Sequence, residues 1–255
     1  MAIQHVGKMT IAGHRGDSYN YYENTMTAFR AAVAAGADMI ETDVHMTKDD
    51  VLILIHDHTV DRTTDGSGST AEMTWAQIAQ LNAGDAFYPE AVPTFEAFMA
   101  WVADEKISIN IEIKEYYSPE NEVRCARCID QIIETVEKYN MRDRTILNSF
   151  DAWVLEYIYH KHGKKYMLHG FYPYETMKNV RINPEEYLYC ACIWGKYEKE
   201  KFDYLIERGI EPWVGSGVTQ SNKFELCVKY GAKLATVNNP KDAIEKLIAL
   251  GYRKG

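Results

Sequence analysis

The side chains best suited to chemistry follow apolar segments at the points where strands are expected to end. The first group is His14, Arg15 and Gly16, directly after the segment 10–13. An imidazole can accept or donate a proton near neutral pH, and a guanidinium can bind a phosphate through two parallel hydrogen bonds. Taken alone, the His-Arg-Gly sequence is also compatible with an ordinary surface turn.

Two carboxylates in the segment 39–44 form the second group. Glu41 and Asp43 are two residues apart, so in a strand their side chains point to the same face. If that face is the interior of the fold, the two negative charges need a partner, and a hard divalent cation is the usual solution. The opposite orientation, with Ile40 and Thr42 inside, is equally compatible with the alternation.

The segment 107–114 is the most informative local pattern in the chain. Four isoleucines alternate in it with polar residues, which include Glu112 and Lys114. The isoleucine face has to be buried against neighbouring elements, so the polar face is expected to point into the interior. An unpaired carboxylate would be costly there. We therefore expect Glu112 and Lys114 to share one cavity with the other charged groups.

His56 adds a second imidazole, since it directly follows the apolar run 51–55. With His14 it forms a candidate pair for acid and base catalysis. The whole set contains carboxylates but no sulfur ligand, which favours Mg²⁺ or Ca²⁺ over structural zinc. Arg15 and Lys114 are the cations suited to a phosphate.

Short apolar strands alternate with amphipathic helices along the chain, which is typical of a parallel sheet covered by helices. Strands are expected at 10–13, 39–44, 51–55, 107–113, 145–148, 166–168, 188–193, 211–214 and 234–237. Helices are expected at 25–35, 94–104, 120–139, 152–161, 198–208, 223–230 and 242–250. About eight strand-helix units in this length predict an α/β fold, the TIM (β/α)8 barrel. A doubly wound sheet is less favoured because a glycine-rich dinucleotide fingerprint is missing.

The alternation is interrupted after the second strand region. Residues 57 to 92 are rich in Thr, Gly, Ser and Asp, and within them only 72–81 has a helical pattern. We interpret this stretch as a small insertion on the rim of the barrel. Residues 1–255 are therefore expected to form a single catalytic TIM-barrel domain with an inserted segment at about 57–92.

The composition excludes several classes of protein. The chain has 28 Lys and Arg against 37 Asp and Glu, a formal net charge of −9, so nucleic-acid binding is not expected. No apolar run approaches the ~18–20 residues that cross a bilayer, and the N-terminal segment lacks the apolar core of a signal peptide. We therefore expect no integral membrane segment and a cytoplasmic location. The five cysteines are expected to be free thiols.

Taken together, these motifs resemble the glycerophosphodiester phosphodiesterase family over nearly the whole chain. The motifs that carry the resemblance are His14-Arg15-Gly16, Glu23-Asn24-Thr25, the segment 36–44, Thr47-Lys48-Asp49, His56-Asp57, the segment 61–68, Ile111-Glu112-Ile113-Lys114 and Ser149-Phe150-Asp151. The chain departs from the family pattern at Tyr22, at Asp50 and in the segments 213–216 and 237–240. The last two lie at strand ends that are expected to line the pocket, which makes Trp213 a candidate pocket residue.

The resemblance implies hydrolysis of a small-molecule glycerophosphodiester to glycerol 3-phosphate and an alcohol, with a divalent cation, Mg or Ca, as cofactor. It also implies roles for seven residues. They are a metal site of Glu41, Asp43 and Glu112, a catalytic pair of His14 and His56, and phosphate contacts from Arg15 and Lys114.

Other functions stay open at this point. A related phosphodiesterase acting on lysophospholipid-type substrates would need an apolar passage for an acyl chain, which 18 tyrosines and five tryptophans could supply. A catalytically silent barrel would bind a ligand without turnover. A glycosidase would use paired carboxylates but would not explain two histidines and two cations. The sequence does not distinguish the released alcohol, Ca²⁺ from Mg²⁺, the acid from the base, or the oligomeric state.

Overall fold

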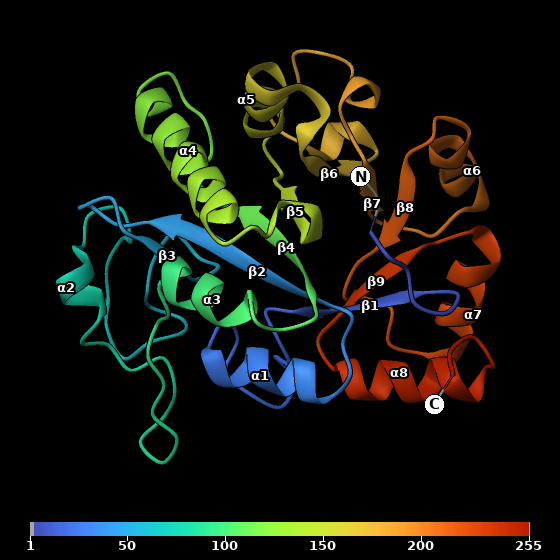
Figure 1. Ribbon diagram of the computed structural model, residues 1–255, viewed down its shortest axis with the longest axis horizontal. Coiled ribbons are helices and arrows are strands. Elements are labelled where there is room, and N and C mark those ends of the chain that lie inside the picture. Colours follow the sequence, from blue (N-terminus) through green and yellow to red (C-terminus); the bar gives the residue numbers. More distant parts are fainter. Residues whose placement is uncertain (1–2, 255) are drawn as a thin grey trace.

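The computed structural model describes residues 3–254, in which parallel strands close into a barrel surrounded by helices (Figure 1). The barrel strands are β1 (Thr10–His14), β2 (Met39–Met46), β4 (Ser108–Ile113), β5 (Thr145–Asn148), β6 (Met167–Tyr172), β7 (Cys190–Ile193), β8 (Glu211–Val214) and β9 (Leu234–Val237). Around the ring the order is β1, β9, β8, β7, β6, β5, β4 and β2, and pairing of β1 with β2 closes it. The predicted TIM barrel is confirmed.

Helices return the chain from the end of one strand to the start of the next. They are α1 (Met26–Ala34), α3 (Phe95–Val102), α4 (Glu122–Lys138), α5 (Ala152–His162), α6 (Lys199–Glu207), α7 (Ser221–Tyr230) and α8 (Pro240–Ala249). Short 3₁₀ helices occur at Arg142–Arg144, Gly163–Lys165, Tyr174–Thr176 and Pro184–Glu186. Thr25, Thr94 and Asp151 begin α1, α3 and α5 because each side chain accepts a backbone N–H of the first turn.

The strand β3 (Leu52–Leu54) runs antiparallel to the far end of β2 and is not part of the closed ring. The chain between β3 and α3 is mostly irregular, and its helix α2 (Trp75–Ile78) is shorter than the predicted helix at 72–81. This segment has an apolar cluster of its own, which consists of Ile53, Ile55, Val60, Ile78, Ala83 and Val92. That the barrel and this inserted segment form a single domain stays a prediction.

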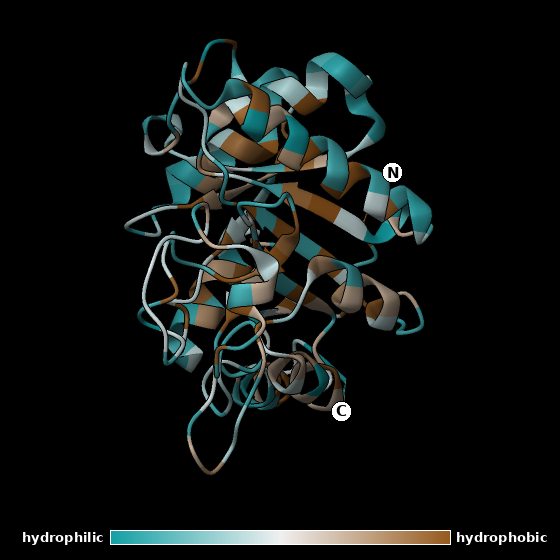
Figure 2. Cartoon of the chain, turned by 90° about the vertical axis from the view of Figure 1, so that its left-hand side faces the viewer, coloured by the Kyte–Doolittle hydropathy of each residue, from teal (hydrophilic) through white to brown (hydrophobic). Residues whose placement is uncertain are grey.

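Side chains alternate between the barrel interior and the helices. In β4, Ile109, Ile111 and Ile113 pack in the main apolar cluster with residues of α4, as the isoleucine alternation predicts. A second apolar cluster brings together alternate residues from most of the barrel strands; its members are Ile3, Ala12, Met39, Ile146, Met167, Cys190, Trp213 and Leu234. Figure 2 shows hydrophobic residues along the strands and hydrophilic residues on the outer faces of the helices.

Two further expectations concern single elements. β6 continues to Tyr172, four residues beyond the predicted end at Leu168, and this extension carries His169 and Phe171 to the mouth of the barrel. All five cysteines are buried free thiols, as expected, and Cys190 and Cys192 both lie on the inner side of β7.

Among residues 3–254, no helix combines the length and the apolar character needed to cross a membrane.

Candidate active site

The turn after β1 brings a histidine and an arginine to the mouth of the barrel. Arg15 has a left-handed backbone conformation with φ of 57°, and its N–H donates to both the carbonyl and a carboxylate oxygen of Glu41, each at 2.9 Å. Gly16 has φ of 85°, and a Cβ there would lie 2.6 Å from the carbonyl carbon of Ala28 in α1. Only glycine therefore fits this close approach of turn and helix, which holds the His14-Arg15 pair in place.

Three carboxylates from two neighbouring strands converge on one point. Glu41 and Asp43 both point inward from β2, and Asp43 pairs in register with Glu112 of β4. Oxygens of Glu41, Asp43 and Glu112 all lie within 4.8 Å of one another, and all three residues are buried. The alternative orientation of β2 does not occur, because Ile40 packs against the helices in the main apolar cluster. This group could hold a metal ion.

The electrostatics of the trio show that three negative charges do not coexist easily. Burial, followed by the neighbouring Asp43, raises the pKa of both Glu41 and Glu112, although Lys114 opposes the rise at Glu112. Burial also acts to raise the pKa of Asp43, but Lys114 and Arg15 outweigh it and lower this pKa to about 2. A bound cation would favour ionisation of all three side chains.

Lys114 lies beside this trio, as its place on the polar face of the 107–114 segment predicts. Its Nζ is 2.5 Å from an Oε1 of Glu112 and 3.1 Å from Oδ1 of Asp43. Although burial opposes its charge, the two carboxylates raise the pKa of Lys114. An ammonium group held this way supplies a permanent positive charge at the edge of the pocket.

Asn24 anchors the buried Asp43 from the turn before α1. Its amide nitrogen donates to Oδ2 of Asp43 at 2.9 Å, and its Oδ1 accepts from the hydroxyl of Thr42 at 2.9 Å. Asn24 itself has a left-handed backbone with φ of 56°, which asparagine tolerates better than most residues. The Glu-Asn-Thr motif is in the sequence, but its link to Asp43 becomes visible only in the folded chain.

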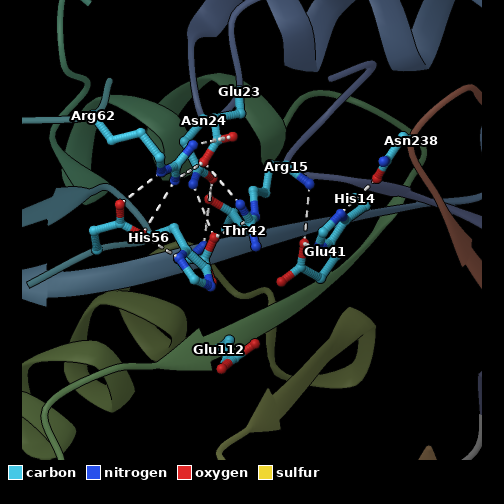
Figure 3. Close-up of polar contacts among 12 residues, drawn as sticks. His14, Arg15, Glu23, Asn24, Glu41, Thr42, His56, Arg62, Glu112 and Asn238 are labelled. Atoms are coloured by element: carbon cyan, nitrogen blue, oxygen red, sulfur yellow. Dashed lines mark hydrogen bonds and ion pairs between the residues drawn. The ribbon is translucent and has the colours of Figure 1, made fainter. Parts of the chain in front are cut away.

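The two histidines have different partners. Nδ1 of His14 lies 2.7 Å from the amide oxygen Oδ1 of Asn238, and its Nε2 is 4.0 Å from Glu41. Burial and the nearby Arg15 lower the pKa of His14 to about 4. Nδ1 of His56 lies 2.6 Å from a carboxylate oxygen of Asp57 (Figure 3). In both residues Nδ1 donates a hydrogen bond, and Nε2 is the ring nitrogen that makes none.

Arg15 connects the turn after β1 to the acidic trio. Its Nε is 3.2 Å from Asp43, and its Nη1 donates to Glu23 at 2.8 Å. Burial opposes the charge of Arg15, but Asp43, Glu41 and Glu23 outweigh that effect and raise its pKa. The guanidinium is therefore a fixed cation that also borders the pocket.

Most of the predicted residues border one cavity of about 230 Å³ at the C-terminal ends of the strands. Those that line it are His14, Arg15, Glu41, His56, Glu112 and Lys114. Asp43 is fully buried beside them. Trp213, which was predicted to line the pocket, does not border this cavity. It is completely buried in the second apolar cluster, and its ring centre lies 4.8 Å from that of His169. Gly215 and Ser216 form the wall after β8 instead.

The opposite side of the cavity is aromatic, and the residues that form it were not among the predicted site residues. Phe150 stacks on Phe171 with ring centres 3.5 Å apart, and Trp194 meets Phe150 edge-on at 5.5 Å. The cavity is also lined by His169 and Asn148, whose Nε2 and Oδ1 atoms are buried without a hydrogen-bond partner. Phe150 follows the end of β5, so the strand-end rule could have found it. Phe171 was missed because Gly170 interrupts the apolar run of β6, so the strand was expected to end earlier.

Most of the chain is similar to proteins of one known family. A profile of the glycerophosphoryl diester phosphodiesterase family matches residues 14–202. A glycerophosphodiester phosphodiesterase of Bacillus altitudinis is 33% identical over 189 residues, which cover 70% of each protein. One from Caldanaerobacter subterraneus subsp. tengcongensis is 39% identical over 152 residues, 58% of this chain and 60% of that protein. The chain thus aligns with less than two thirds of the length of the latter relative.

Solved structures share the architecture at low sequence identity. A putative glycerophosphoryl diester phosphodiesterase from Silicibacter pomeroyi superposes with a TM-score of 0.84 at 19% identity, covering 97% of this chain and 95% of that one. A phosphodiesterase from Oleispira antarctica, solved in complex with the product sn-glycerol-3-phosphate, has a TM-score of 0.81 at 17% identity, with coverages of 94% and 96%. These likenesses support the fold.

Proposed function

Because this chain belongs to the glycerophosphoryl diester phosphodiesterase family, we propose that it hydrolyses a small glycerophosphodiester to glycerol 3-phosphate and an alcohol. The observation that carries the proposal is the convergence of two imidazoles, two cations and three carboxylates at one cavity. The Oleispira antarctica phosphodiesterase was solved with sn-glycerol-3-phosphate, the compound that we propose as the product here.

The trio of Glu41, Asp43 and Glu112 would hold a divalent cation. We propose Mg²⁺ or Ca²⁺, because every donor is a hard carboxylate oxygen. When bound, the cation would supply charge stabilisation for the phosphoryl oxygens. Arg15 and Lys114 add two fixed positive charges from the protein, and the guanidinium can bind two phosphate oxygens at once.

The partners of the two histidines support an assignment of their roles. His14 faces the neutral amide of Asn238, so it is suited to accept a proton on its free Nε2. His56 faces the carboxylate of Asp57, which can share the positive charge of a protonated ring. We therefore assign His14 as the general base and His56 as the general acid.

The reaction balances with these two groups. His14 takes the proton from a hydroxyl, either of water or of the neighbouring glycerol carbon, while the new P–O bond forms. The bond from phosphorus to the departing oxygen breaks, and His56 gives that oxygen its proton. Attack by the glycerol hydroxyl would produce a cyclic phosphate that water then opens. Phosphorus NMR of the early reaction mixture distinguishes the two routes.

The aromatic wall favours a second candidate substrate class. Phe150, Phe171 and Trp194 border the cavity opposite the charged groups, and the indole of Trp194 is half exposed. Such a wall could carry the acyl chain of a lysophospholipid as well as a compact alcohol. The substrate of the chain would then be a lysophospholipid whose phosphate occupies the same position.

The assay compares glycerophosphocholine with lysophosphatidylcholine. Glycerol 3-phosphate should appear from the former when Mg²⁺ or Ca²⁺ is present and should disappear after treatment with EDTA. Faster turnover of lysophosphatidylcholine would favour the second candidate. If the protein binds metal in a calorimetric titration but cleaves neither compound, the barrel is a binding module and the proposed activity is wrong.

A further inference from the structure

Arg62 stands at the centre of an ion-pair cluster outside the catalytic cavity. It belongs to the inserted segment between β3 and α3, and its guanidinium contacts two carboxylates at once (Figure 3). Its Nε and Nη2 donate to Asp57 at 2.7 and 3.2 Å, and its Nη1 and Nη2 donate to Glu23 at 2.9 and 2.7 Å. This planar, two-sided geometry is available to arginine and not to lysine.

Each of these carboxylates has a second partner, and both of those partners line the cavity. Asp57 accepts from Nδ1 of His56 at 2.6 Å, while Glu23 accepts from Nη1 of Arg15 at 2.8 Å. A continuous chain of contacts therefore runs from the His56 imidazole through Asp57, Arg62 and Glu23 to the Arg15 guanidinium. Arg62 itself does not line the cavity.

We propose that Arg62 is a positioning residue. Through it, the inserted segment fixes the His56 imidazole and the phosphate-binding Arg15 guanidinium relative to each other. The proposal rests on the function proposed above, because it assigns His56 and Arg15 to catalysis and phosphate binding. With Arg62 in place, Asp57 and Glu23 are each held from two sides. Without it, each carboxylate keeps only its partner at the cavity, and both side chains gain rotational freedom. A loss of alignment of this kind is costly to a reaction that needs near-attack geometry.

The first test is kinetic and compares the parent protein with three variants on glycerophosphocholine. Arg62→Gln removes the charge and should lower kcat/KM on the order of 10- to 100-fold. Arg62→Lys restores the charge but not the fork, so it should recover only part of that loss. Guanidinium added to Arg62→Ala should raise its rate, whereas added sodium at the same ionic strength should not.

Arg127→Gln is the matched control, since Arg127 also forms an ion pair with an aspartate, Asp50, at the surface away from the cavity. It should leave kcat/KM unchanged. Melting temperatures are recorded for every variant, and Arg62→Gln should lose no more than a few degrees because its ion pairs are half exposed. A large drop in rate with a small drop in melting temperature separates positioning from folding.

A double-variant cycle tests the chain of contacts itself. If Arg62 acts on His56 through Asp57, Asp57→Asn combined with Arg62→Gln should be little slower than the slower single variant. Fully multiplicative losses, or an Arg62→Gln rate within twofold of the parent protein, would overturn the proposal while leaving the proposed function intact. If the parent protein itself cleaves no diester, the proposed function fails first, and the Arg62 comparison is then made by phosphate affinity, which should fall in Arg62→Gln.

Discussion

The chemistry of the pocket depends on side chains whose ordinary properties have been changed by their surroundings. His14 is an example: burial and Arg15 lower its pKa to about 4, so its ring is neutral across the physiological range. A neutral ring with Nδ1 bonded to Asn238 keeps a lone pair on Nε2. The nearby carboxylates respond in the opposite direction, because burial raises the pKa of Glu41 and Glu112. Shifted pKa values of this kind are typical of functional sites, and they support the proposed role of this pocket.

At the scale of single residues, we expect the two histidines to be separately essential. His14→Ala and His56→Ala should each lower kcat on glycerophosphocholine by about 10²- to 10⁴-fold, since each removes one proton-transfer step. Initial-rate measurements at saturating substrate report this value. His160→Ala, an exposed histidine of α5, is the control and should keep the parent rate. Turnover within a few-fold of the parent by either pocket variant contradicts the assignment.

At the scale of secondary-structure elements, Arg124 joins α4 to the far ends of β2 and β4. Its guanidinium donates to Glu115 at 3.0 Å and to the backbone carbonyls of Met46 and Thr47. Glu115 also accepts the backbone N–H of Met46 at 3.1 Å, so a buried carboxylate ties the strand to the helix. Behind the pocket, Nε2 of His45 contacts the carbonyl of His56 at 3.2 Å.

Because of this connection, the free energy of unfolding should depend on pH in the acidic range. Burial acts to raise the pKa of Glu115, but hydrogen bonds from His45 and Arg124 outweigh it and lower the pKa to about 2. Because the folded pKa lies below the ordinary value, the contribution of Glu115 is complete above about pH 4.5 and is lost as the pH falls towards 2. The full contribution is roughly 3 kcal/mol.

The measurement is the free energy of unfolding in urea for the parent protein and for Glu115→Gln across this range. The parent should be more stable near neutral pH, and the difference should shrink steadily below about pH 4.5. Glu134→Gln, an exposed position of the same α4 helix, should show no such pH-dependent difference. A difference that stays constant from about pH 4.5 down to about pH 2, the span in which the group titrates, would disprove the role of Glu115.

At the scale of the whole molecule, the barrel tolerates buried charges because they are gathered at one end. Inward residues elsewhere include an apolar cluster with Met39, Ile146 and Trp213 among its members. The acidic trio comes from β2 and β4, which are adjacent in the sheet though separated in sequence by β3, α2 and α3. A cation bound there would bridge two strands of the folded barrel and would find no equivalent site in the unfolded chain.

Metal should therefore stabilise the entire fold. At a concentration of about 100 times its Kd, a cation that binds only the native state adds about 2.7 kcal/mol, which corresponds to roughly 5–10 °C in Tm for a protein of this size. Calorimetry with EDTA, Mg²⁺ and Ca²⁺ measures the shift and ranks the two metals. Glu41→Gln should reduce it. A Tm that is unchanged through a titration with either metal would exclude a divalent site at the trio.

The sequence predicted a large part of this arrangement because local rules applied. Alternation along 107–114 oriented Glu112 and Lys114 correctly, since isoleucines on one face require burial on that side. The strand-end rule located His14 and His56 at the mouth of the barrel. The same rule was wrong about Trp213: its large apolar ring fills the closed interior below the cavity, and the residues after it form the wall.

What the sequence determined by itself is which residue types are available and which strand or turn carries each of them. Whether Glu41 and Asp43 faced inward was undecided, because both orientations of β2 satisfied the local alternation. The tertiary structure decided it, since closing the ring sets the partners of β2 on both sides. It also brought Asn238 to His14 across 224 residues and Arg62 to Glu23 across 39. Contacts of this length depend on the geometry of the whole barrel, and no periodicity along the chain encodes them.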